Sequence, residues 1–314
     1  MPLGGPRPRL WCLNLDAEDE LRRGAGYTPT RATLAAVAAA RGGAMTLLAP
    51  ADQLLAEPDA SGGRAGAERA RGAAAPTEPE GGRFDGAAWC PTPRALARLR
   101  AAGANLPPAP SFDTLRRVNA SRFPYDVLPP RLPGACVVHR RDDAEAWMAE
   151  RAPHAGAWLK RAYGAAGRGK LHVTEGPLSP RAQTFLTDAE LALGVVLEPH
   201  VAISLEVSQH GWLGEDGSLT LGVPCVQHVE RGRFLSVRVA RADELHGAER
   251  EALGDTIRRL ALALRHAGYF GPFGVDAYRY ADEHGRGHFN PCGELNARYT
   301  MGYAAGMAGT ERSE

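Results

Sequence analysis

A glycine-rich stretch bounded by the only two lysines of the chain limits the possible folds more than any other sequence feature. Lys160 ends one run of strand-forming residues and Lys170 precedes another, so the stretch predicts the tip of a hairpin. Its three glycines, Gly164, Gly167 and Gly169, would let backbone amides approach an anion closely. Lysine is a more compact point charge than arginine, which supplies the rest of the 37 basic residues. The stretch therefore predicts a phosphate-binding loop, and the alternative is a surface loop with two incidental lysines.

The composition is that of an ordinary globular chain. Its 314 residues suggest two or three lobes, because one domain usually holds about 100–200 residues. A net charge of +1 gives no general attraction to nucleic acid or membranes. No apolar run approaches the roughly 20 residues that span a bilayer, and no apolar signal region opens the chain, so we expect a cytoplasmic protein. The five scattered cysteines, none in a CxxC pair, favour neither disulfides nor a cysteine-type zinc site.

Residues 1–118 have the alternating pattern of an α/β domain with parallel strands. We expect strand 9–15, helix 29–40, strand 45–48, strand 86–90 and helix 93–102. Gly42 and Gly43 are the expected stop of the first helix. Residues 59–83 are rich in Ala, Gly, Arg, Glu and Pro and predict a mobile loop or insertion. Whether it serves as a lid stays open.

Two further lobes are expected, at 119–199 and 200–314. In the first we expect helices 121–128, 142–151 and 179–190, and strands 135–139, 157–161, 171–174 and 195–199. In the second we expect strands 204–210, 219–228, 234–240, 273–280 and 288–296. A long helix over 241–266 carries apolar residues at helical spacing.

A second polar cluster lies near the end of the chain, on the last two expected strands. Asp276 is on one strand, and Glu294, Asn296 and Arg298 follow at alternate positions of the next, so the three share a face. Two carboxylates and an amide oxygen form an oxygen-only set that suits Mg²⁺. Arg298 could hold a phosphate or stabilise developing negative charge. The alternative is a solvated strand face with a surface ion pair, and the preceding phosphate loop favours the metal site.

The order of these features resembles the ATP-grasp superfamily, over roughly residues 119–314. The resemblance implies an ATP-grasp fold of α/β and α+β class. Two lobes grip ATP in this fold, and a Rossmann-like α/β pre-domain precedes them. Residues 1–118 match that pre-domain loosely. Any one motif is weak, and four in the right order are strong.

Carried over residue by residue, the resemblance implies contacts to ATP. Lys160 is the strand lysine, and the three glycines form the flap over the phosphates. Glu198 is the carboxylate that opens the adenine hinge. The carbonyl of Pro199 and the amide of Val201 would then face adenine, and Glu206 would contact the ribose. Proline loses no needed donor in this hinge, because only its carbonyl is used.

The resemblance also implies the metal ligands and the catalytic groups. Asp276, Glu294 and Asn296 match the Mg²⁺ ligands. Arg298 would stabilise the oxyanion of a tetrahedral intermediate, and Lys160 would act on the phosphates during transfer.

The chain departs from the family pattern at several positions. Where the family usually has a lysine opening the middle lobe, only Arg122 is available for a phosphate. Gly274 replaces an arginine that some D-alanine ligase-like members place two residues before the first metal acid, and the glycine and glutamate signature of that subgroup is absent. The biotin carboxylase-like register fits better, although the chain is too short for the additional C-terminal domain of those enzymes.

The resemblance implies an ATP-dependent carboxylate–amine ligase. It would form an amide or peptide bond through an acyl phosphate and release ADP and phosphate. The expected cofactors are ATP and Mg²⁺. The expected partners are a small carboxylate, with amino acids among the candidates, and an amine, but neither nucleic acid nor membrane. A phosphotransferase and a non-catalytic nucleotide-binding protein stay open as alternatives, whereas a serine hydrolase lacks its GxSxG elbow. A homodimer is the default oligomeric state.

Four basic residues precede the metal strands and could recognise a carboxylate substrate. They are His228, Arg231, Arg233 and Arg238. The alternative is a solvated basic turn. The sequence leaves open whether His228 or Arg122 lies in the active site, and it identifies neither substrate.

Overall fold

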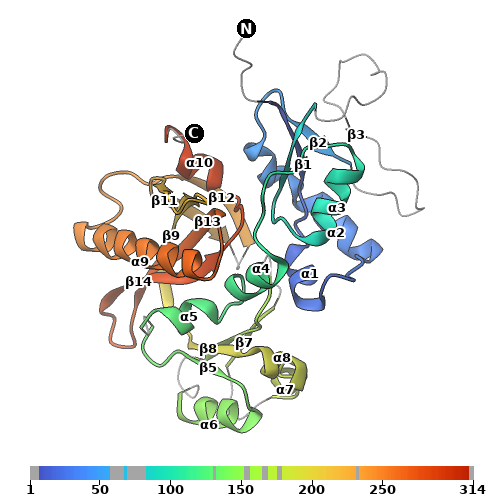
Figure 1. The fold of residues 1–314 in the computed structure, drawn as a ribbon. Coiled ribbons are helices and arrows are strands. Elements are labelled where there is room, and N and C mark those ends of the chain that lie inside the picture. The colour runs from blue at the N-terminus through green and yellow to red at the C-terminus, as the bar shows by residue number, and fades with distance from the viewer. Residues whose placement is uncertain are drawn as a thin grey trace.

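The strands form three β-sheets in the residues that the structure describes (Figure 1). The computed structural model describes residues 7–56, 67–68, 83–129, 132–151, 156–164, 169–174, 179–230 and 233–310. Gly167, Arg231 and most of the 59–83 stretch lie outside these ranges, as does the side chain of Arg233. Each sheet is made by one part of the chain, in sequence order.

The first sheet confirms the predicted parallel α/β arrangement. Its strands lie in the order β3-β2-β1-β4, with β1 parallel to both β2 and β4. The strands are β1 (Arg9–Cys12), β2 (Gln53–Leu55), β3 (Ala67–Glu68) and β4 (Asp85–Ala88). The helices are α1 (Ala17–Arg23), α2 (Arg31–Ala44) and α3 (Pro93–Ala101), with a 3₁₀ turn, η1, at Met45–Leu47.

Two predictions for this region are wrong. Residues expected as the second strand form η1, and that strand begins only at Gln53. Gly42 and Gly43 do not end α2, because a glycine inside a helix costs only about 1 kcal/mol and packing can offset it. A Cβ on Gly43 would lie 2.9 Å from the Met301 sulfur, so the glycine permits close packing. The short helix α1, absent from the prediction, carries residues that prove important below.

The second sheet is antiparallel, with the order β5-β8-β6-β7. Its strands are β5 (Cys136–Val138), β6 (Ala157–Lys160), β7 (Lys170–Val173) and β8 (Val195–Pro199). The helices of this part are α4 (Phe112–Val118), α5 (Phe123–Val127), α6 (Arg141–Arg151), α7 (Pro180–Phe185) and α8 (Asp188–Leu193). The predicted hairpin of β6 and β7 is confirmed. The helix predicted over 179–190 is two helices, because Thr187 accepts a hydrogen bond from Glu190 N and starts a new one.

The third sheet has the order β12-β11-β9-β13-β14, and β10 pairs with β9 at one end. Its strands are β9 (Ala202–Leu213), β10 (Leu219–Leu221), β11 (Cys225–Glu230), β12 (Arg233–Val239), β13 (Gly271–Ala281) and β14 (Gly287–Asn296). The predicted strand 219–228 is interrupted before β11, where Pro224 lacks a backbone donor. Helix α9 (Gly247–His266) lies between β12 and β13, and helix α10 (Tyr303–Met307) follows β14. Helix α9 starts later than predicted, at a capping box of His246 and Glu249.

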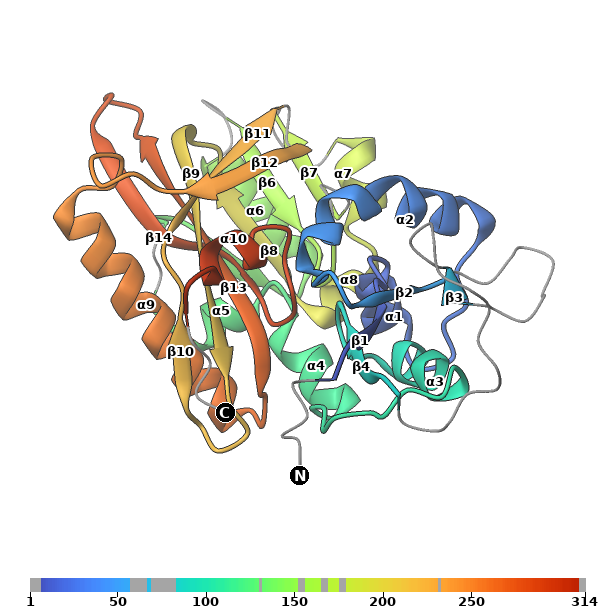
Figure 2. The same cartoon turned by 90° about the horizontal axis from the view of Figure 1, so that it is seen from above.

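Helix α9 covers one face of the third sheet (Figure 2). Its buried Leu253, Ile257 and Leu260 share a core with Val275 and Ala277 of β13. Side chains alternate along a strand, so Asp276 between these two points to the opposite face. The apolar face thus fixes the direction of Asp276, one of the predicted metal ligands.

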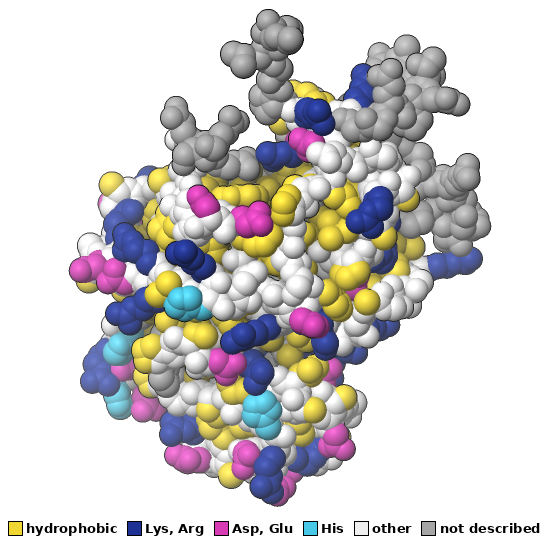
Figure 3. Space-filling view, viewed as in Figure 1, with side chains coloured by type: hydrophobic (Ala, Val, Ile, Leu, Met, Phe, Trp, Pro, Cys, Tyr) yellow, Lys and Arg dark blue, Asp and Glu magenta, His cyan; other side chains and the backbone are white. Residues whose placement is uncertain are grey.

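The described surface has mixed charge. On the face in Figure 3, basic and acidic side chains are interspersed, in keeping with the net charge of +1. Among the described helices, none combines the length and the apolar character that crossing a membrane requires. The domain limits near residues 118 and 199 stay predictions.

Candidate functional site

The second and third sheets meet at two lysines. Both lysines belong to the second sheet, and they contact a carbonyl and a carboxylate of β14 in the third sheet. Lys160 at the end of β6 lies with Nζ 2.7 Å from Glu198 Oε2 and 3.4 Å from the Gly293 carbonyl oxygen of β14. Lys170 at the start of β7 donates to Glu294 Oε2 at 2.7 Å. Both lysines of the chain therefore lie between the two sheets, in the position expected for groups that neutralise phosphates.

Asp276 and Glu294 are direct partners across β13 and β14. Gln227 Nε2 donates to Asp276 Oδ1 at 2.6 Å, and Asn296 Nδ2 donates to Oδ2 at 3.2 Å. Burial, and next the neighbouring Glu294, raise the pKa of Asp276 to about 7. Burial acts to raise the pKa of Glu294, but Lys170, together with Lys160 and Arg298, outweighs burial and the pKa is lowered. The pair carries more negative charge than the lysine neutralises, which favours a divalent cation.

The predicted Mg²⁺ ligands fit the ion by their chemistry. Asp276, Glu294 and Asn296 lie on neighbouring strands and offer only oxygen donors, which Mg²⁺ prefers. Within the described ranges, no three His, Cys, Asp or Glu side chains converge as a metal cluster. The predicted ligands would hold Mg²⁺ through few protein oxygens, together with water and phosphate.

The predicted hinge carboxylate is fully engaged in this structure. Glu198 is 4% exposed, pairs with Lys160, and accepts a short hydrogen bond from the Tyr125 hydroxyl of α5. Val201 follows β8, and among the described residues its N–H donates no hydrogen bond. That free donor lies where the resemblance expects adenine. Pro199, the last residue of β8, pairs with Ala157.

Gly169 closes the base of the glycine loop. Its φ of +84° is in the left-handed region, and a Cβ there would lie 2.9 Å from Gly164 Cα and 3.0 Å from the Tyr163 carbonyl oxygen. The Gly169 carbonyl accepts from Arg161 N at 2.8 Å. Only glycine fits this position, so the two ends of the loop are held together by a backbone contact.

The remaining predicted nucleotide contacts have different surroundings. Glu206 on β9 lies across from Tyr278 on the same face as Asp276, and burial raises its pKa while Lys170 opposes the shift. Arg122 instead precedes α5, and its ion pair is with Asp126 at 3.8 Å. The structure thus brings Glu206 to the metal face and gives Arg122 an exposed partner of its own helix.

Arg298 lies beyond the end of β14, so strand alternation does not determine its direction. Its guanidinium forms an ion pair with Glu18 of α1 and donates to the Tyr299 carbonyl at 3.1 Å. It also stacks over Trp89 at 5.5 Å. Both charged side chains are about nine-tenths buried. The first domain therefore fixes the predicted oxyanion-stabilising group.

Of the two possibilities left open for His228 and Arg238, the structure favours a position away from the cleft. Gln227, next to His228, points to the Asp276 carboxylate, so His228 points to the opposite face. Arg238 of β12 lies opposite Val226 of β11, on the same face as Val226. Its guanidinium forms an ion pair with Glu244. These two residues therefore do not line the metal face.

His210 is a buried neutral histidine, which makes stability depend on pH. It is 1% exposed, and burial lowers its pKa to about 4 from the ordinary 6.5. The unfolded chain binds the proton first, so stability is full above pH 6.5 and is lost as the pH falls toward 4. We expect the unfolding free energy in urea to fall by roughly 2 kcal/mol through this group between pH 6.5 and 5. His210→Phe should flatten that dependence, and exposed His266→Gln should not; an unchanged slope in His210→Phe would contradict the assignment.

Sequence reasoning missed four residues that hold the site together. Gln227 donates a hydrogen bond to Asp276, and Tyr125 donates one to Glu198. Glu18 forms an ion pair with Arg298, and the Trp89 ring stacks against the same guanidinium. Lys170 and Glu294 were both singled out from the sequence, but their ion pair was not predicted. Each of these contacts joins segments far apart in the sequence, so no local pattern could indicate them.

Comparison with known proteins gives the fold. The D-alanyl-alanine synthetase A structure from Vibrio cholerae matches 93% of this chain and 89% of its own, with 13% identity and a TM-score of 0.52. The sequence matches no protein-family model and no curated protein. Together with the sheet arrangement, this likeness confirms the predicted ATP-grasp fold.

Two other similar structures match a smaller part of the chain. N5-carboxyaminoimidazole synthetase from Staphylococcus aureus, complexed with ADP, has 12% identity over 65% of this chain and 51% of that chain, with a TM-score of 0.44. The biotin carboxylase domain of the Hydrogenobacter thermophilus 2-oxoglutarate carboxylase, in complex with MgADP and bicarbonate, has 16% identity over 66% and 45%, with a TM-score of 0.48. The matched part is thus about half the length of those proteins.

Proposed function

We propose that the protein is an ATP-dependent carboxylate–amine ligase that forms an amide through an acyl phosphate. The observation that carries this proposal is the meeting of the two lysines of the second sheet with β14 of the third, Lys160 at the Gly293 carbonyl and Lys170 at the Glu294 carboxylate. Facing cations and carboxylates between two sheets suit a nucleotide polyphosphate held through a divalent cation. The ATP-grasp fold supports the same reading.

In the proposed reaction, the substrate carboxylate attacks the γ-phosphorus, and the bond to the ADP oxygen breaks. The amine nitrogen then attacks the acyl carbon, phosphate leaves with the electrons of the C–O bond, and the amine proton is released. Bound Mg²⁺ would neutralise charge on the phosphates. Asp276, Glu294 and Asn296 would hold it, and Lys160 would position the phosphates.

The remaining residues take roles that follow from their places. Val201 N–H and the Pro199 carbonyl would bind adenine, and Glu206 the ribose. Gly164 and Gly169 bring backbone amides near the phosphates. Arg298, held by the first domain, would stabilise the oxyanion of the tetrahedral intermediate.

The test is ADP release from Mg-ATP with a panel of carboxylates, each with and without an amine. Release that requires both partners supports the ligase. Release with a stable phosphorylated product and no amine requirement supports a phosphotransferase instead. AMP in place of ADP contradicts the acyl-phosphate route, and tight ATP binding without turnover across the panel indicates a nucleotide-binding protein.

A further inference from the structure

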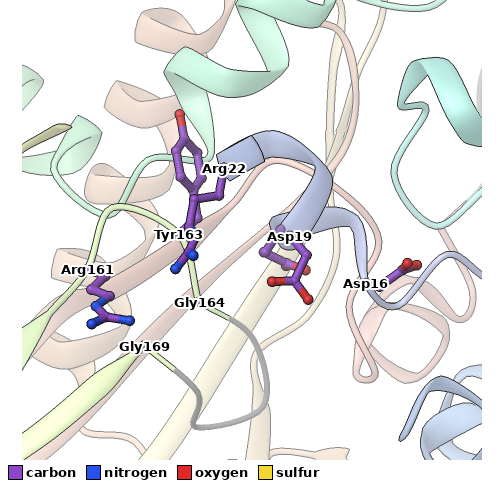
Figure 4. Close-up of a pocket in the computed structure, with 8 residues that line it drawn as sticks. Asp16, Asp19, Arg22, Arg161, Tyr163, Gly164 and Gly169 are labelled. Atoms are coloured by element: carbon purple, nitrogen blue, oxygen red, sulfur yellow. The ribbon is translucent and has the colours of Figure 1, made fainter. Parts of the chain in front are cut away.

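A cavity of about 130 Å³ lies between helix α1 and the base of the glycine loop (Figure 4). It is distinct from the predicted metal ligands, none of which lines it. Charged side chains of both signs line it: Asp16, Glu18, Asp19, Arg22 and Arg161. Its size suits a molecule of a few heavy atoms, because one water occupies about 30 Å³ of liquid volume.

The two arginines form one wall. Arg22 Nη1 lies 3.0 Å and Arg161 Nε 3.7 Å from the same oxygen, Glu190 Oε1. Arg161 is further fixed by donating to the Phe185 carbonyl at 3.0 Å. Two guanidinium groups share a single carboxylate, so this wall has one positive charge in excess. Arginine binds carboxylates in a bidentate manner, which makes the wall a carboxylate site.

The acidic residues form the opposite wall, as Figure 4 shows for Asp16 and Asp19 relative to Arg161. Asp16 is neutralised by Arg94 at 3.0 Å. Glu18 pairs with Arg298 through Oε1, but its Oε2 is buried and accepts no hydrogen bond within the described residues. The half-buried Asp19 carboxylate has no hydrogen-bond or ion-pair partner in the described part of the chain. A buried carboxylate oxygen without a donor is costly, so this wall requires a cationic donor.

We infer that the cavity binds a small amino acid as a zwitterion. Its carboxylate lies against Arg22 and Arg161, and its ammonium group against Asp19 and the free oxygen of Glu18. One excess positive charge and one unpaired negative charge match the two ends of such a molecule. A simple amine or a simple carboxylate would leave one wall uncompensated.

The cavity also orients the amino acid. Glu18 contacts Arg298, so the ammonium end lies nearest the group proposed to stabilise the oxyanion. The bound molecule is therefore the amine co-substrate, and Asp19 is placed to accept its proton. This role rests on the proposed ligase function, whereas binding of the amino acid does not.

Isothermal titration calorimetry on the full chain with ADP and Mg²⁺ tests the inference. The probes are the twenty common L-amino acids and D-alanine, then the methyl ester and the deaminated acid of each that binds. We expect at least one amino acid to bind and both derivatives to bind at least about tenfold more weakly. Failure of every amino acid to bind, or equal binding of either derivative, would overturn the inference.

Substitutions locate the binding. Asp19→Asn and Arg22→Gln should each weaken amino acid binding about tenfold. The matched controls are Asp113→Asn and Arg117→Gln, two exposed positions on α4. Equal loss in the controls and the cavity variants, or no loss in either cavity variant, would overturn the assignment.

The titration and the ADP-release assay, run on the same variants, separate the two proposals. Amino acid binding that depends on Asp19 and Arg22, without ADP release for any carboxylate, supports the cavity and contradicts the ligase. Amine-dependent ADP release that is unaffected in both variants supports the ligase and contradicts the cavity.

Discussion

Replacing Glu294 by glutamine should lower ADP release at least about a thousand-fold, which is several kcal/mol of barrier. The change keeps the shape of the side chain but removes one of two charges that face each other across β13 and β14. Under the proposed function, bound Mg²⁺ would lose a carboxylate ligand, and Lys170 loses its partner at 2.7 Å. The measurement is kcat/KM for ADP release, together with the rise in melting temperature that Mg-ATP produces. We expect kcat/KM to fall by this factor and the rise in melting temperature with Mg-ATP to disappear.

Glu283→Gln is the matched control for this substitution. Glu283 lies in the turn between the same two strands, and its side chain is 77% exposed. It should retain the rate and the Mg-ATP effect within about twofold, as distant surface substitutions do. If Glu294→Gln behaved like this control, the metal assignment would be wrong.

The second large effect concerns Arg298, whose replacement should lower both the unfolding free energy and the rate, for two different reasons. Arg298→Met removes the counterion of Glu18, whose side chain is 9% exposed, and leaves a buried charge. The unfolding free energy should fall by about 3–5 kcal/mol. Loss of an oxyanion-stabilising group should also reduce the rate by about a hundred- to a thousand-fold. Urea unfolding and ADP release measure the two effects independently.

The double variant Glu18→Gln/Arg298→Met distinguishes a structural from a catalytic role. Replacing both partners removes the uncompensated charge, so most of the lost stability should return. The rate should not return, because no cation is restored near the acyl carbon. Recovery of both properties would show that Arg298 serves only to hold the two domains together.

Much of the fold could be predicted because local patterns determine it. The hairpin of β6 and β7 has strand-forming runs on both sides of a glycine loop, and this loop is where it was expected. Errors arose where tertiary contacts outweigh a local signal. Gly43 remains inside a helix because Met301, far away in the sequence, packs against it. The two short helices around Thr187 depend on a single side-chain cap, which a periodic pattern cannot indicate.

The site was predictable to a similar degree. Regular spacing on one strand placed Glu294 and Asn296 on one face, because alternation is a property of the strand itself. Arg298 follows the end of that strand, so its direction depends on Glu18 and Trp89. The cavity beside α1 could not be predicted. The residues that pair with its charged side chains, Arg94, Glu190 and Arg298, come from three separate parts of the chain.

The chain just after β14 is bound both to the first domain and to the start of the predicted middle lobe. Tyr299 N donates to the Trp89 carbonyl of the first domain at 3.1 Å. Asn119, where the predicted middle lobe begins, accepts from the Ala297 N–H at 3.0 Å and donates to the Ala297 carbonyl at 3.3 Å. The rings of Trp11 and Tyr299 lie 5.1 Å apart in the same core. Exchanging the first domain for that of another such protein would remove the Trp11 and Trp89 contacts that hold this end of β14. Under the proposed function, substitutions within the acidic wall of the cavity would change the amine specificity and keep these contacts, whereas recombination of whole domains would break them.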